Sequence, residues 1–546
     1  MKEGTKTVSG NIVDLLGLEV FPATLEISEG RIAEIIREDR KFATYILPGF
    51  VDSHIHIESS MLLPSEFARL AVLHGTVAVV SDPHEIANVL GIDGVRYMIR
   101  NGQETPLKFY FGAPSCVPAT TFETSGAVID PEQVEDLLKE EEIKYLSEMM
   151  NFPGVVNNAP VVAKKIEMAK RYSKPIDGHA PGLRGKDLKK YVEAGISTDH
   201  ECLTKEEALE KIGLGMKIQI REGSAAKNFA QLIPIIEEHA QSCMFASDDR
   251  HPDDLIKGHI NELVKRALRL GYDRMKVLRC ACLNPVFHYG LDVGLLQKGD
   301  RADFVIIDNF ESFNILKTYI NGEKVAENGK ALFPQVPAEI VNNFQAEKKE
   351  VRDFQLNKTG ETINVIEAID GQLITERVQV RPKVIDDYLV SDTKRDILKI
   401  TVVNRYRNAP PAIGFIKGFG LREGAVSTSV AHDSHNIVAV GVSDEDICRA
   451  VNKVIENRGG LTVVCGDLCQ TLPLPIAGLM SDKDGFEVAR QYAKLDSLTK
   501  GLGSKLKSPF MTLSFMALLV IPKIKLSDKG LFDGERFEFI AKEVKG

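Results

Sequence analysis

Eight short apolar runs between residues 49 and 290 decide the fold, and each ends in polar or ionisable residues. The first four are GFVDSHIHIE (49–58), TVAVVSDPHE (76–85), KFYFGAPS (108–115) and IKYLSEMM (143–150). The other four are KPIDGHAP (174–181), GISTDHE (195–201), KIQIREGS (217–224) and CMFASDD (243–249). Helix-like stretches lie between them, and alternation of this kind favours a parallel sheet. The sequence therefore predicts an α/β chain with a (β/α)8 TIM-like barrel.

The intervening stretches carry helix signals. PSEFARLAVLHG (64–75) and NAPVVAKKIEMAKRYS (158–173) have apolar residues at a spacing of three to four. DPEQVEDLLKEE (130–141) is acidic at its start, and TKEEALEKIG (204–213) opens with the capping-box pair Thr204 and Glu207. HPDDLIKGHINELVKRALRLG (251–271) is predicted to be one helix that ends at Gly271.

The flanks of the barrel differ from it. Residues 1–48 and 291–335 contain short β-like runs, and we expect them to pair into one small β-sandwich domain beside a barrel of residues 49–290. The polar stretch 336–360 leads into a third region, in which strand-like and helix-like runs alternate. We expect residues 336–546 to form a C-terminal α/β (α+β) domain.

Composition narrows the class of protein. Hydrophobic residues make up 44% and charged residues 27% of the 546 residues, which excludes a disordered or fibrous chain. The net charge of −9 disfavours a broad nucleic-acid-binding face. No apolar run approaches the ~18 residues that span a bilayer, and the N-terminus lacks the apolar region of a signal peptide. The eight cysteines have no regular framework, so we expect reduced thiols in a cytoplasmic protein.

Ionisable side chains stand at the ends of several predicted barrel strands. His54 and His56 are two apart on the first strand and therefore point to the same side. An HxH pair alone is a modest signal, because it also arises by chance. Four further candidates follow later strands: Glu148, His179, His200 and Asp248. Alone, each could be a rim ion-pair partner, a core histidine or a helix cap. Together they indicate one metal centre of imidazoles and carboxylates, suited to Zn, Mn or Fe.

Six candidate ligands exceed the needs of one ion, so they suggest two ions bridged by Glu148. A bound divalent ion lowers the pKa of water from 15.7 to about 7, which generates hydroxide at neutral pH. A neighbouring carboxylate can take the proton of that hydroxide and pass it to a leaving group. Asp248, on the last strand, is the predicted proton shuttle.

Longer blocks of the sequence resemble one family. PGFVDSHIHIE (48–58) and the closing NPVFHYGLDVGLLQKGDRADFVIID (284–308) are similar to the amidohydrolase superfamily of metal-dependent hydrolases. HIHIESSM (54–61), SDPHEIANVLG (81–91), EMMNFPGV (148–155), DGHAPGL (177–183), TDHE (198–201), REGSAAKN (221–228) and SDDRHPDDL (247–255) resemble the adenine deaminase family within it. AHDSHNIVAVG (431–441) and ALLVIPKIKLSDKGLFDG (517–534) extend the resemblance to the C-terminal part.

The resemblance implies hydrolytic deamination of adenine to hypoxanthine and ammonia, a purine-salvage reaction, and a free base fits a barrel mouth. It implies two divalent metal ions, Mn2+ or Fe2+ with Zn2+ as a further option, and a homodimer without nucleic-acid or membrane partners. By position, the implied metal ligands are His54, His56, Glu148, His179, His200 and Asp248. Glu148 on the fourth strand argues against relatives that use a carboxylated lysine there.

The expected mechanism is attack of a metal-bound hydroxide on C6 of adenine, with Asp248 moving the proton. A carboxylic acid must protonate a ring nitrogen, and Glu201 or Glu85 are the candidates. A third set of residues is expected to bind substrate, support the ligands or hold an extra metal; simple rim hydrogen bonding is the alternative for each. This set is Asp82, His84, Arg221, Glu222 and Ser224.

Several alternatives stay open on the sequence. The same fold could act on another aminopurine or a cyclic amide, or serve as a non-catalytic scaffold, although all six candidate ligands are present. A zinc cytidine-type deaminase is excluded, because no PCxxC follows the HxE at 56–58. The segment HDSHN (432–436) could bind a metal or cover the active site, but we expect a surface or domain-interface loop.

Overall fold

The computed structural model describes residues 5–544, and its central element is a closed parallel barrel. Its eight strands are β5 (Phe50–Ile55), β6 (Thr76–Ser81), β7 (Lys108–Ala113), β8 (Ile143–Met149), β9 (Ile176–Gly178), β10 (Thr198–Asp199), β11 (Lys217–Arg221) and β12 (Cys243–Ala246). Backbone hydrogen bonds join β5 to β9, in sequence order, into one sheet of five strands and β10 to β12 into one of three. Ser197 N donates to Ile176 O at one seam, and Asp248 N donates to His54 O at the other. The predicted barrel fold is confirmed.

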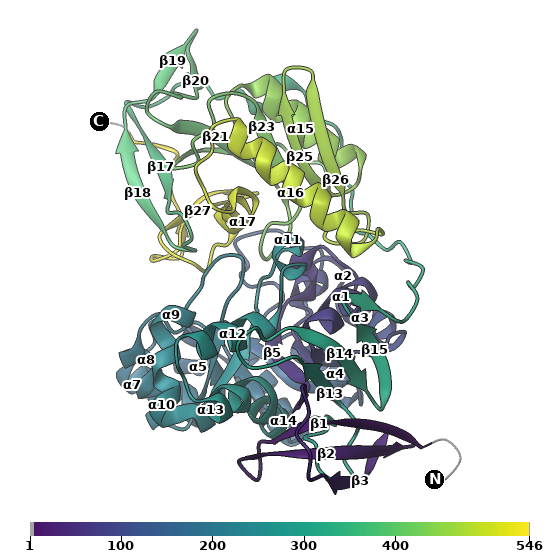
Figure 1. Ribbon diagram of the computed structural model, residues 1–546. Coiled ribbons are helices and arrows are strands. Elements are labelled where there is room, and N and C mark those ends of the chain that lie inside the picture. The colour runs from purple at the N-terminus through teal and green to yellow at the C-terminus, as the bar shows by residue number, and fades with distance from the viewer. Residues whose placement is uncertain (1–4, 545–546) are drawn as a thin grey trace.

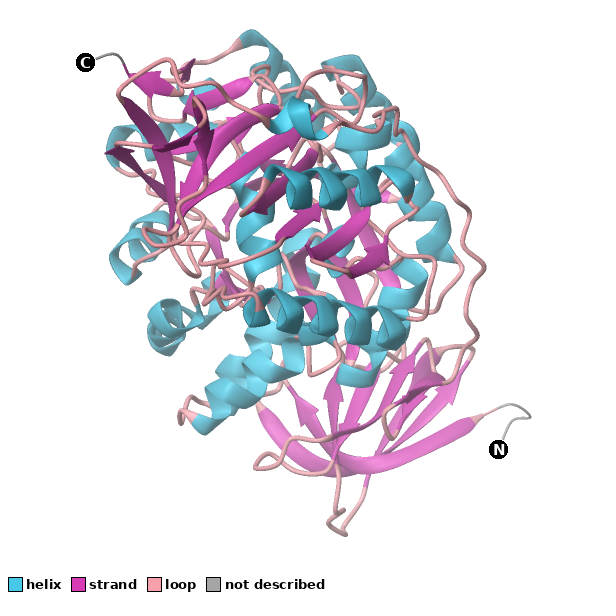
Figure 2. Cartoon of the chain, turned by 90° about the horizontal axis from the view of Figure 1, so that it is seen from above, coloured by secondary structure: helices cyan, strands magenta, loops and turns pink. Residues whose placement is uncertain are grey.

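Helices surround these strands, as Figure 2 shows from above. They are α1 (Pro64–Ala71), α2 (His84–Leu90), α3 (Ile92–Gln103), α4 (Pro131–Lys139), α5 (Phe152–Val156), α6 (Pro160–Arg171), α7 (Gly185–Glu193), α8 (Lys205–Gly213), α9 (Phe229–Leu232), α10 (Ile236–His239), α11 (Pro252–Leu255), α12 (Ile260–Arg269), α13 (Arg274–Leu278) and α14 (Asn284–Tyr289). The predicted N-cap of α8 is present, because the Thr204 side chain accepts from Glu207 N. Buried apolar residues of α1, α4, α8 and α12 belong to the same core as those of the strands, and the loops at the strand ends carry polar groups.

The single helix expected over 251–271 is wrong, because the structure breaks it into α11 and α12. His259 lies at the break and has a non-helical backbone. Its Nε2 is 2.8 Å from Asp52 Oδ2, and its Nδ1 is 2.7 Å from Thr76 Oγ1. These buried tertiary contacts outweigh the helical pattern of the surrounding sequence.

The two flanks share one eight-stranded sheet, set apart from the barrel in Figures 1 and 2. Its members, in spatial order, are β16 (Lys330–Ala331), β15 (Glu323–Glu327), β14 (Ile315–Ile320), β13 (Phe304–Ile307), β4 (Tyr45–Pro48), β1 (Lys6–Asp14), β2 (Glu19–Ser28) and β3 (Arg31–Arg37). β4 and β13 pair antiparallel and join the segment before the barrel to the segment after it.

A second large sheet occupies the C-terminal part of the chain. Its order is β18 (Thr375–Val380), β17 (Thr362–Ala368), β22 (Ala412–Lys417), β21 (Ile397–Val403), β24 (Ile437–Gly441), β23 (Ala425–Thr428), β25 (Gly460–Cys465) and β26 (Leu468–Pro473), and β30 (Glu543–Val544) pairs with β17. Two small sheets accompany it, β19 (Lys383–Ile385) with β20 (Tyr388–Val390), and β27 (Ile524–Ser527), β28 (Gly530–Asp533) and β29 (Glu538–Phe539). The helices are α15 (Asp444–Glu456), α16 (Gly485–Gly501) and α17 (Pro509–Ser514).

The C-terminal part lies against the barrel, above it in Figure 1. Ser481 N donates to Met61 O at 2.9 Å, and Thr124 Oγ1 donates to Asp528 Oδ2 at 2.7 Å. Met61 and Thr124 follow barrel strands β5 and β7, so these contacts lie on the side where the strands end. No helix within residues 5–544 has the length and apolar character needed to cross a bilayer. All eight cysteines are free thiols.

Candidate metal centre at the barrel mouth

Two histidine rings meet at the end of the first barrel strand. His54 lies near the end of β5 and His56 just beyond it, and both are buried. Their Nε2 atoms are 3.2 Å apart. His56 Nδ1 lies 3.1 Å from the backbone carbonyl oxygen of Asp82. Because a carbonyl can only accept, Nδ1 carries the proton and Nε2 presents a lone pair.

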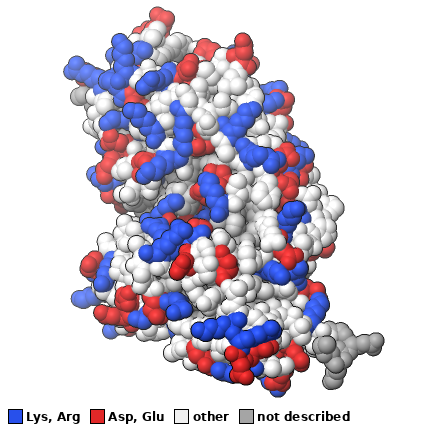
Figure 3. Space-filling view, viewed as in Figure 1, with Lys and Arg blue, Asp and Glu red and all other residues white. Residues whose placement is uncertain are grey.

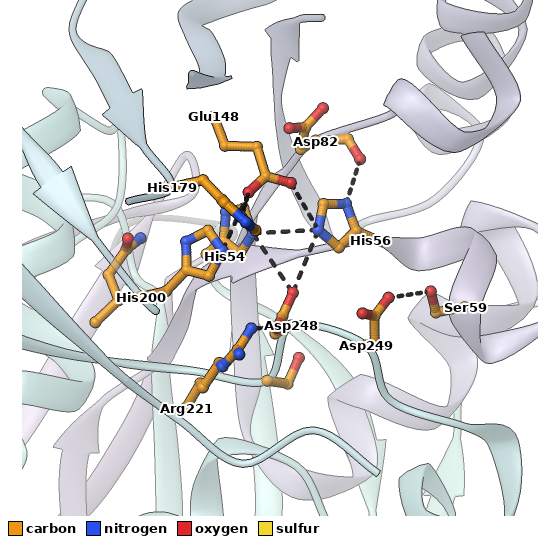
Figure 4. Close-up of polar contacts among 12 residues, drawn as sticks. His54, His56, Ser59, Asp82, Glu148, His179, His200, Arg221, Asp248 and Asp249 are labelled. Carbon is orange, nitrogen blue, oxygen red and sulfur yellow. Dashed lines mark hydrogen bonds and ion pairs between the residues drawn. The ribbon is translucent and has the colours of Figure 1, made fainter. Parts of the chain in front are cut away.

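Asp248 reaches the same point from the last strand. It follows β12, and its backbone N–H donates to His54 O at 2.9 Å, which fixes the carboxylate beside the two histidines. Asp248 Oδ1 is 3.6 Å from His54 Nε2 and 3.3 Å from His56 Nε2. Figure 4 shows the three side chains pointing toward one another. Three potential donor atoms thus surround one position.

Glu148 connects this group to a second one. It lies on β8, and its Oε1 is 3.4 Å from His56 Nε2. Its other oxygen, Oε2, is 2.7 Å from His179 Nδ1 and 3.1 Å from His200 Nε2. His179 and His200 follow β9 and β10, and Figure 4 shows both rings beside the Glu148 carboxylate. One carboxylate therefore faces two groups of histidine nitrogens.

Electrostatics keep both carboxylates ionised. Burial alone would raise the pKa of Glu148, but His179 and His200 hold that pKa well below its usual range. Burial would likewise raise the pKa of Asp248, and the Arg221 guanidinium beside it outweighs this effect and holds the pKa well below its usual range. Ionised carboxylates are the form that ligates cations.

These side chains fit a divalent cation. The donor atoms of His54, His56 and Asp248 lie within 4.8 Å of one another, as do those of His54, Glu148 and His200. His56 turns a lone pair toward His54 Nε2, 3.2 Å away, and a cation at this position would take lone pairs from both buried nitrogens. Imidazole and carboxylate donors without a thiolate suit Zn, Mn or Fe.

Arg221 lies beside Asp248 and binds two carboxylates of the site. It ends β11 and is 3% exposed. Its Nη1 donates to Asp248 Oδ2, and its Nη2 donates to Glu201 Oε2 at 2.7 Å. Glu201 Oε1 in turn lies 3.6 Å from His179 Nδ1. Arg221 therefore links two carboxylates that flank the histidines.

The block SDPHE lies on the other side of the same group. His84 Nδ1 is 3.2 Å from Asp82 Oδ2 and 3.5 Å from Glu148 Oε1. Glu85 points away toward the C-terminal part, where its carboxylate contacts His432 and His435. Burial would raise the pKa of Glu85, but His432, His84 and His435 hold it well below its usual range.

The other two residues of the expected set lie elsewhere. Glu222 forms an ion pair with Arg266 at 3.1 Å. Ser224 Oγ donates to Asp254 Oδ2 at 2.7 Å and accepts from His251 N. The structure does not bring Glu222 or Ser224 to the histidines of the barrel mouth.

The segment 432–436, expected as a surface or domain-interface loop, is a buried loop that contacts Glu85 of the barrel. His432, Asp433 and His435 are each at most 3% exposed. The HxxH-like spacing was visible in the sequence, but its partner Glu85 lies 347 residues away from His432. Asp52 is another residue that sequence reasoning missed: it is fully buried, and its Oδ1 accepts from Ser247 N and His54 N. No local pattern distinguishes it from the other acidic residues.

Comparisons with known proteins show which family this chain resembles. The model of the Amidohydrolase family matches residues 45–325, and that of the Adenine deaminase C-terminal domain matches residues 372–538. The adenine deaminase of Sulfurovum sp. (strain NBC37-1) is 58% identical over 98% of this chain and 99% of that protein. Those of Salinibacter ruber and Methanosarcina mazei are 54% and 53% identical over the same shares. The chain therefore belongs to the adenine deaminase family of the amidohydrolase superfamily.

Proposed function

We propose that this protein hydrolyses adenine to hypoxanthine and ammonia. The reaction consumes one water, whose oxygen becomes the C6 oxygen of hypoxanthine, while the exocyclic nitrogen leaves as ammonia. The observation that carries the proposal is the buried Glu148 carboxylate, whose two oxygens face two groups of histidine nitrogens. Near full-length similarity to proteins named adenine deaminase supports the choice of substrate.

The proposed cofactor is a pair of divalent metal ions, Mn2+ or Fe2+, with Zn2+ as a further option. The residues that would hold them are His54, His56, Glu148, His179, His200 and Asp248. When bound, such ions lower the pKa of water from 15.7 to about 7 and so supply a nucleophile at neutral pH. The protein's own contribution is to fix these side chains and to move protons.

Asp248 is the proposed proton acceptor. Its Oδ2 is occupied by Arg221, whereas its Oδ1 faces the histidine nitrogens and is the atom that takes the proton of the attacking water. Arg221 keeps the resting carboxylate ionised, as a proton acceptor requires. The same oxygen returns the proton to the exocyclic nitrogen, because ammonia is a better leaving group than an amide anion.

A second proton must reach a ring nitrogen as C6 becomes tetrahedral, and the proton left on the new C6 oxygen replaces it when the carbonyl of hypoxanthine forms. Glu201 and Glu85 were both candidates for this step, and we propose Glu201. Glu201 Oε1 is 3.6 Å from His179 Nδ1, beside the proposed ligands. Glu85 instead directs both carboxylate oxygens at His432 and His435. Comparing Glu201→Gln with Glu85→Gln tests this choice, and only the former should abolish turnover.

The compartment, oligomeric state and partners of the enzyme are also part of the proposal. We infer a cytoplasmic homodimer that acts on a free base and water and binds neither nucleic acid nor membrane. Positive and negative side chains are interspersed over the face shown in Figure 3, and the net charge is −9. Neither feature favours a polyanionic partner.

A substrate panel tests the proposed function. Purified Mn2+-loaded protein is incubated separately with adenine, adenosine, guanine, cytosine and a cyclic amide, and ammonia release is measured. The proposal predicts rapid release from adenine alone. Release from guanine or hydrolysis of the cyclic amide, with adenine left intact, would assign this site to a different substrate.

A further inference from the structure

A second cluster of ionisable side chains lies where the C-terminal part meets the barrel. We call it the junction cluster; it consists of His84, Glu85, His432, Asp433 and His435, and all are at most 3% exposed. His84 and Glu85 begin α2 of the barrel, and the other three lie between β23 and β24. None of the steps proposed for adenine hydrolysis requires this cluster.

Histidines hold the Glu85 carboxylate in one orientation. His435 Nδ1 accepts from Ala431 N at 3.2 Å, so the ring proton is on Nε2, which lies 2.5 Å from Glu85 Oε2 and donates to it. His432 Nδ1 contacts Oε1 of the same carboxylate. A carboxylate that is hydrogen-bonded from behind in this way is typical of metal ligands, whose orientation depends on such partners.

His84 and Asp433 face Glu85 from two sides. His84 Nε2 is 3.5 Å from Glu85 Oε1 and 4.0 Å from Asp433 Oδ1. The donor atoms of the three residues lie within 4.8 Å of one another. His84 directs its other nitrogen, Nδ1, at Asp82 Oδ2, 3.2 Å away. His84 Nε2 therefore lies on the side of Glu85 and Asp433, and a cation bound there would replace its proton.

The charges of the junction cluster are not balanced by lysine or arginine. Within residues 5–544, the only ion-pair partners of Glu85 and Asp433 are histidines. Asp433 Oδ2 is buried without a hydrogen-bond partner. A buried carboxylate oxygen without a partner is unfavourable. A cation bound by Asp433 would supply that partner.

The chain fixes Asp433 firmly enough for a cation site. Arg405 is fully buried and donates from Nη1 to His435 O at 3.2 Å, and its backbone N–H donates to Asn436 Oδ1 at 3.0 Å. Tyr406 Oη donates to Ser434 O at 2.6 Å on the other side of the segment. These contacts hold residues 434–436 directly after Asp433, so the carboxylate is presented with little loss of conformational entropy on binding.

We propose that His84, Glu85 and Asp433 form a third divalent-cation site, separate from the two sites at the barrel mouth and shared between the barrel and the C-terminal part. One imidazole and two carboxylates suit Mn2+, Fe2+ or Zn2+, and two carboxylates neutralise the ion. Because the ligands come from both parts of the chain, the bound ion ties them together. His84 Nδ1 is 3.5 Å from Glu148 Oε1, so His84 connects this third site to the metal centre at the barrel mouth.

The test is a count of bound metal. Apoprotein is dialysed to equilibrium against Zn2+, and metal per chain is measured by mass spectrometry for wild type and for Asp433→Asn. The matched control is Asp528→Asn, a second aspartate of the C-terminal part that contacts the barrel through Thr124. We expect three ions per chain in wild type and in the control, and two in Asp433→Asn.

Two outcomes overturn the proposal. Saturation of the wild type at two ions would mean that a proton compensates for Asp433. Three ions in both wild type and Asp433→Asn would put the third ion elsewhere. If Asp433→Asn is misfolded by circular dichroism, Glu85→Gln is counted in its place and must show the same loss of one ion. Adenine turnover by wild type with two ions would leave the proposed function intact and reject only this site.

Discussion

Arg221 and Asp248 form a buried ion pair directly beside the histidines of the barrel mouth. The guanidinium occupies Asp248 Oδ2, so that only Oδ1 is available to the histidine side of the site. Arg221 also binds Glu201. One arginine thus determines both the orientation and the charge of the proposed proton acceptor, and it couples that acceptor to the proposed ring-nitrogen acid.

Arg221→Gln tests this coupling through the pH profile. Arg221 holds the pKa of Asp248 well below its usual range against the opposing effect of burial, so its loss raises that pKa. Asp248 is then protonated at a higher pH, and the acid limb of the kcat/KM profile moves to higher pH. The control is Arg266→Gln, which removes a half-exposed arginine paired with Glu222 and should leave the profile unchanged. Equal acid limbs in Arg221→Gln and wild type would contradict the coupling.

Asp248→Asn tests the proton shuttle itself. The variant keeps the shape of the side chain but cannot accept a proton, so kcat should fall by about 10² to 10⁴ while the far-ultraviolet circular dichroism is unchanged. Hypoxanthine formation from adenine measures the loss. Asp292→Asn, at an exposed position, should retain full activity. Turnover close to that of wild type in Asp248→Asn would remove Asp248 from this role.

Asp52→Asn tests how the strand ends are held together. Asp52 Oδ1 accepts from Ser247 N at 3.0 Å and from His54 N at 3.3 Å, so it joins the strands that carry His54 and Asp248. An amide can turn an N–H toward these donors and disturb both. We expect metal affinity, measured by chelator competition, to fall by about 10- to 100-fold. Unchanged affinity would show that the strand ends keep their positions without the carboxylate.

His251→Gln tests the acid stability of the contact between the barrel and the C-terminal part. His251 Nδ1 lies 2.5 Å from the Tyr492 hydroxyl oxygen, and burial lowers its pKa from 6.5 to about 3. Because the unfolded state binds the proton more readily, this histidine's contribution is complete above pH 6.5 and is lost as the pH falls toward 3. At pH 5.5 the loss is about 1.4 kcal/mol relative to pH 7.5.

Urea unfolding of wild type and His251→Gln at pH 7.5 and 5.5 measures this difference. The variant has no titrating group at the position, so its free energy of unfolding should fall less than that of wild type by about 1.4 kcal/mol over the interval. Equal falls in the two proteins would mean that His251 takes up no proton on unfolding in this range.

The barrel and the candidate metal ligands can be predicted from local patterns in the sequence. His54 and His56 share a side because side chains alternate along a strand. Glu148 and Asp248 stand at or just beyond strand ends, and in a closed barrel all strand ends of one kind meet at one mouth. The α8 cap depends on Thr204 and Glu207, three positions apart, and is equally predictable from local sequence. Each of these inferences needs only the spacing of neighbours.

The features that escaped the sequence depend on long-range contacts. Glu85 and His432 are separated by 347 residues, and nothing near either residue indicates the other. The break before α12 arises because His259 turns toward Asp52, a contact that overrides a strong helical pattern. The sequence leaves several roles open for Arg221, from ligand support to rim hydrogen bonding, and its contact with Asp248 depends on the packing of β11 beside β12.

Turnover of adenine before and after metal removal tests the central claim most directly. Protein is treated with a chelator, desalted, and reloaded with Mn2+, and hypoxanthine and ammonia are both quantified at each stage. The account predicts equal amounts of the two products from loaded protein, loss of both after chelation, and recovery on reloading. Full turnover by protein shown to be free of metal, or ammonia without hypoxanthine, would contradict it.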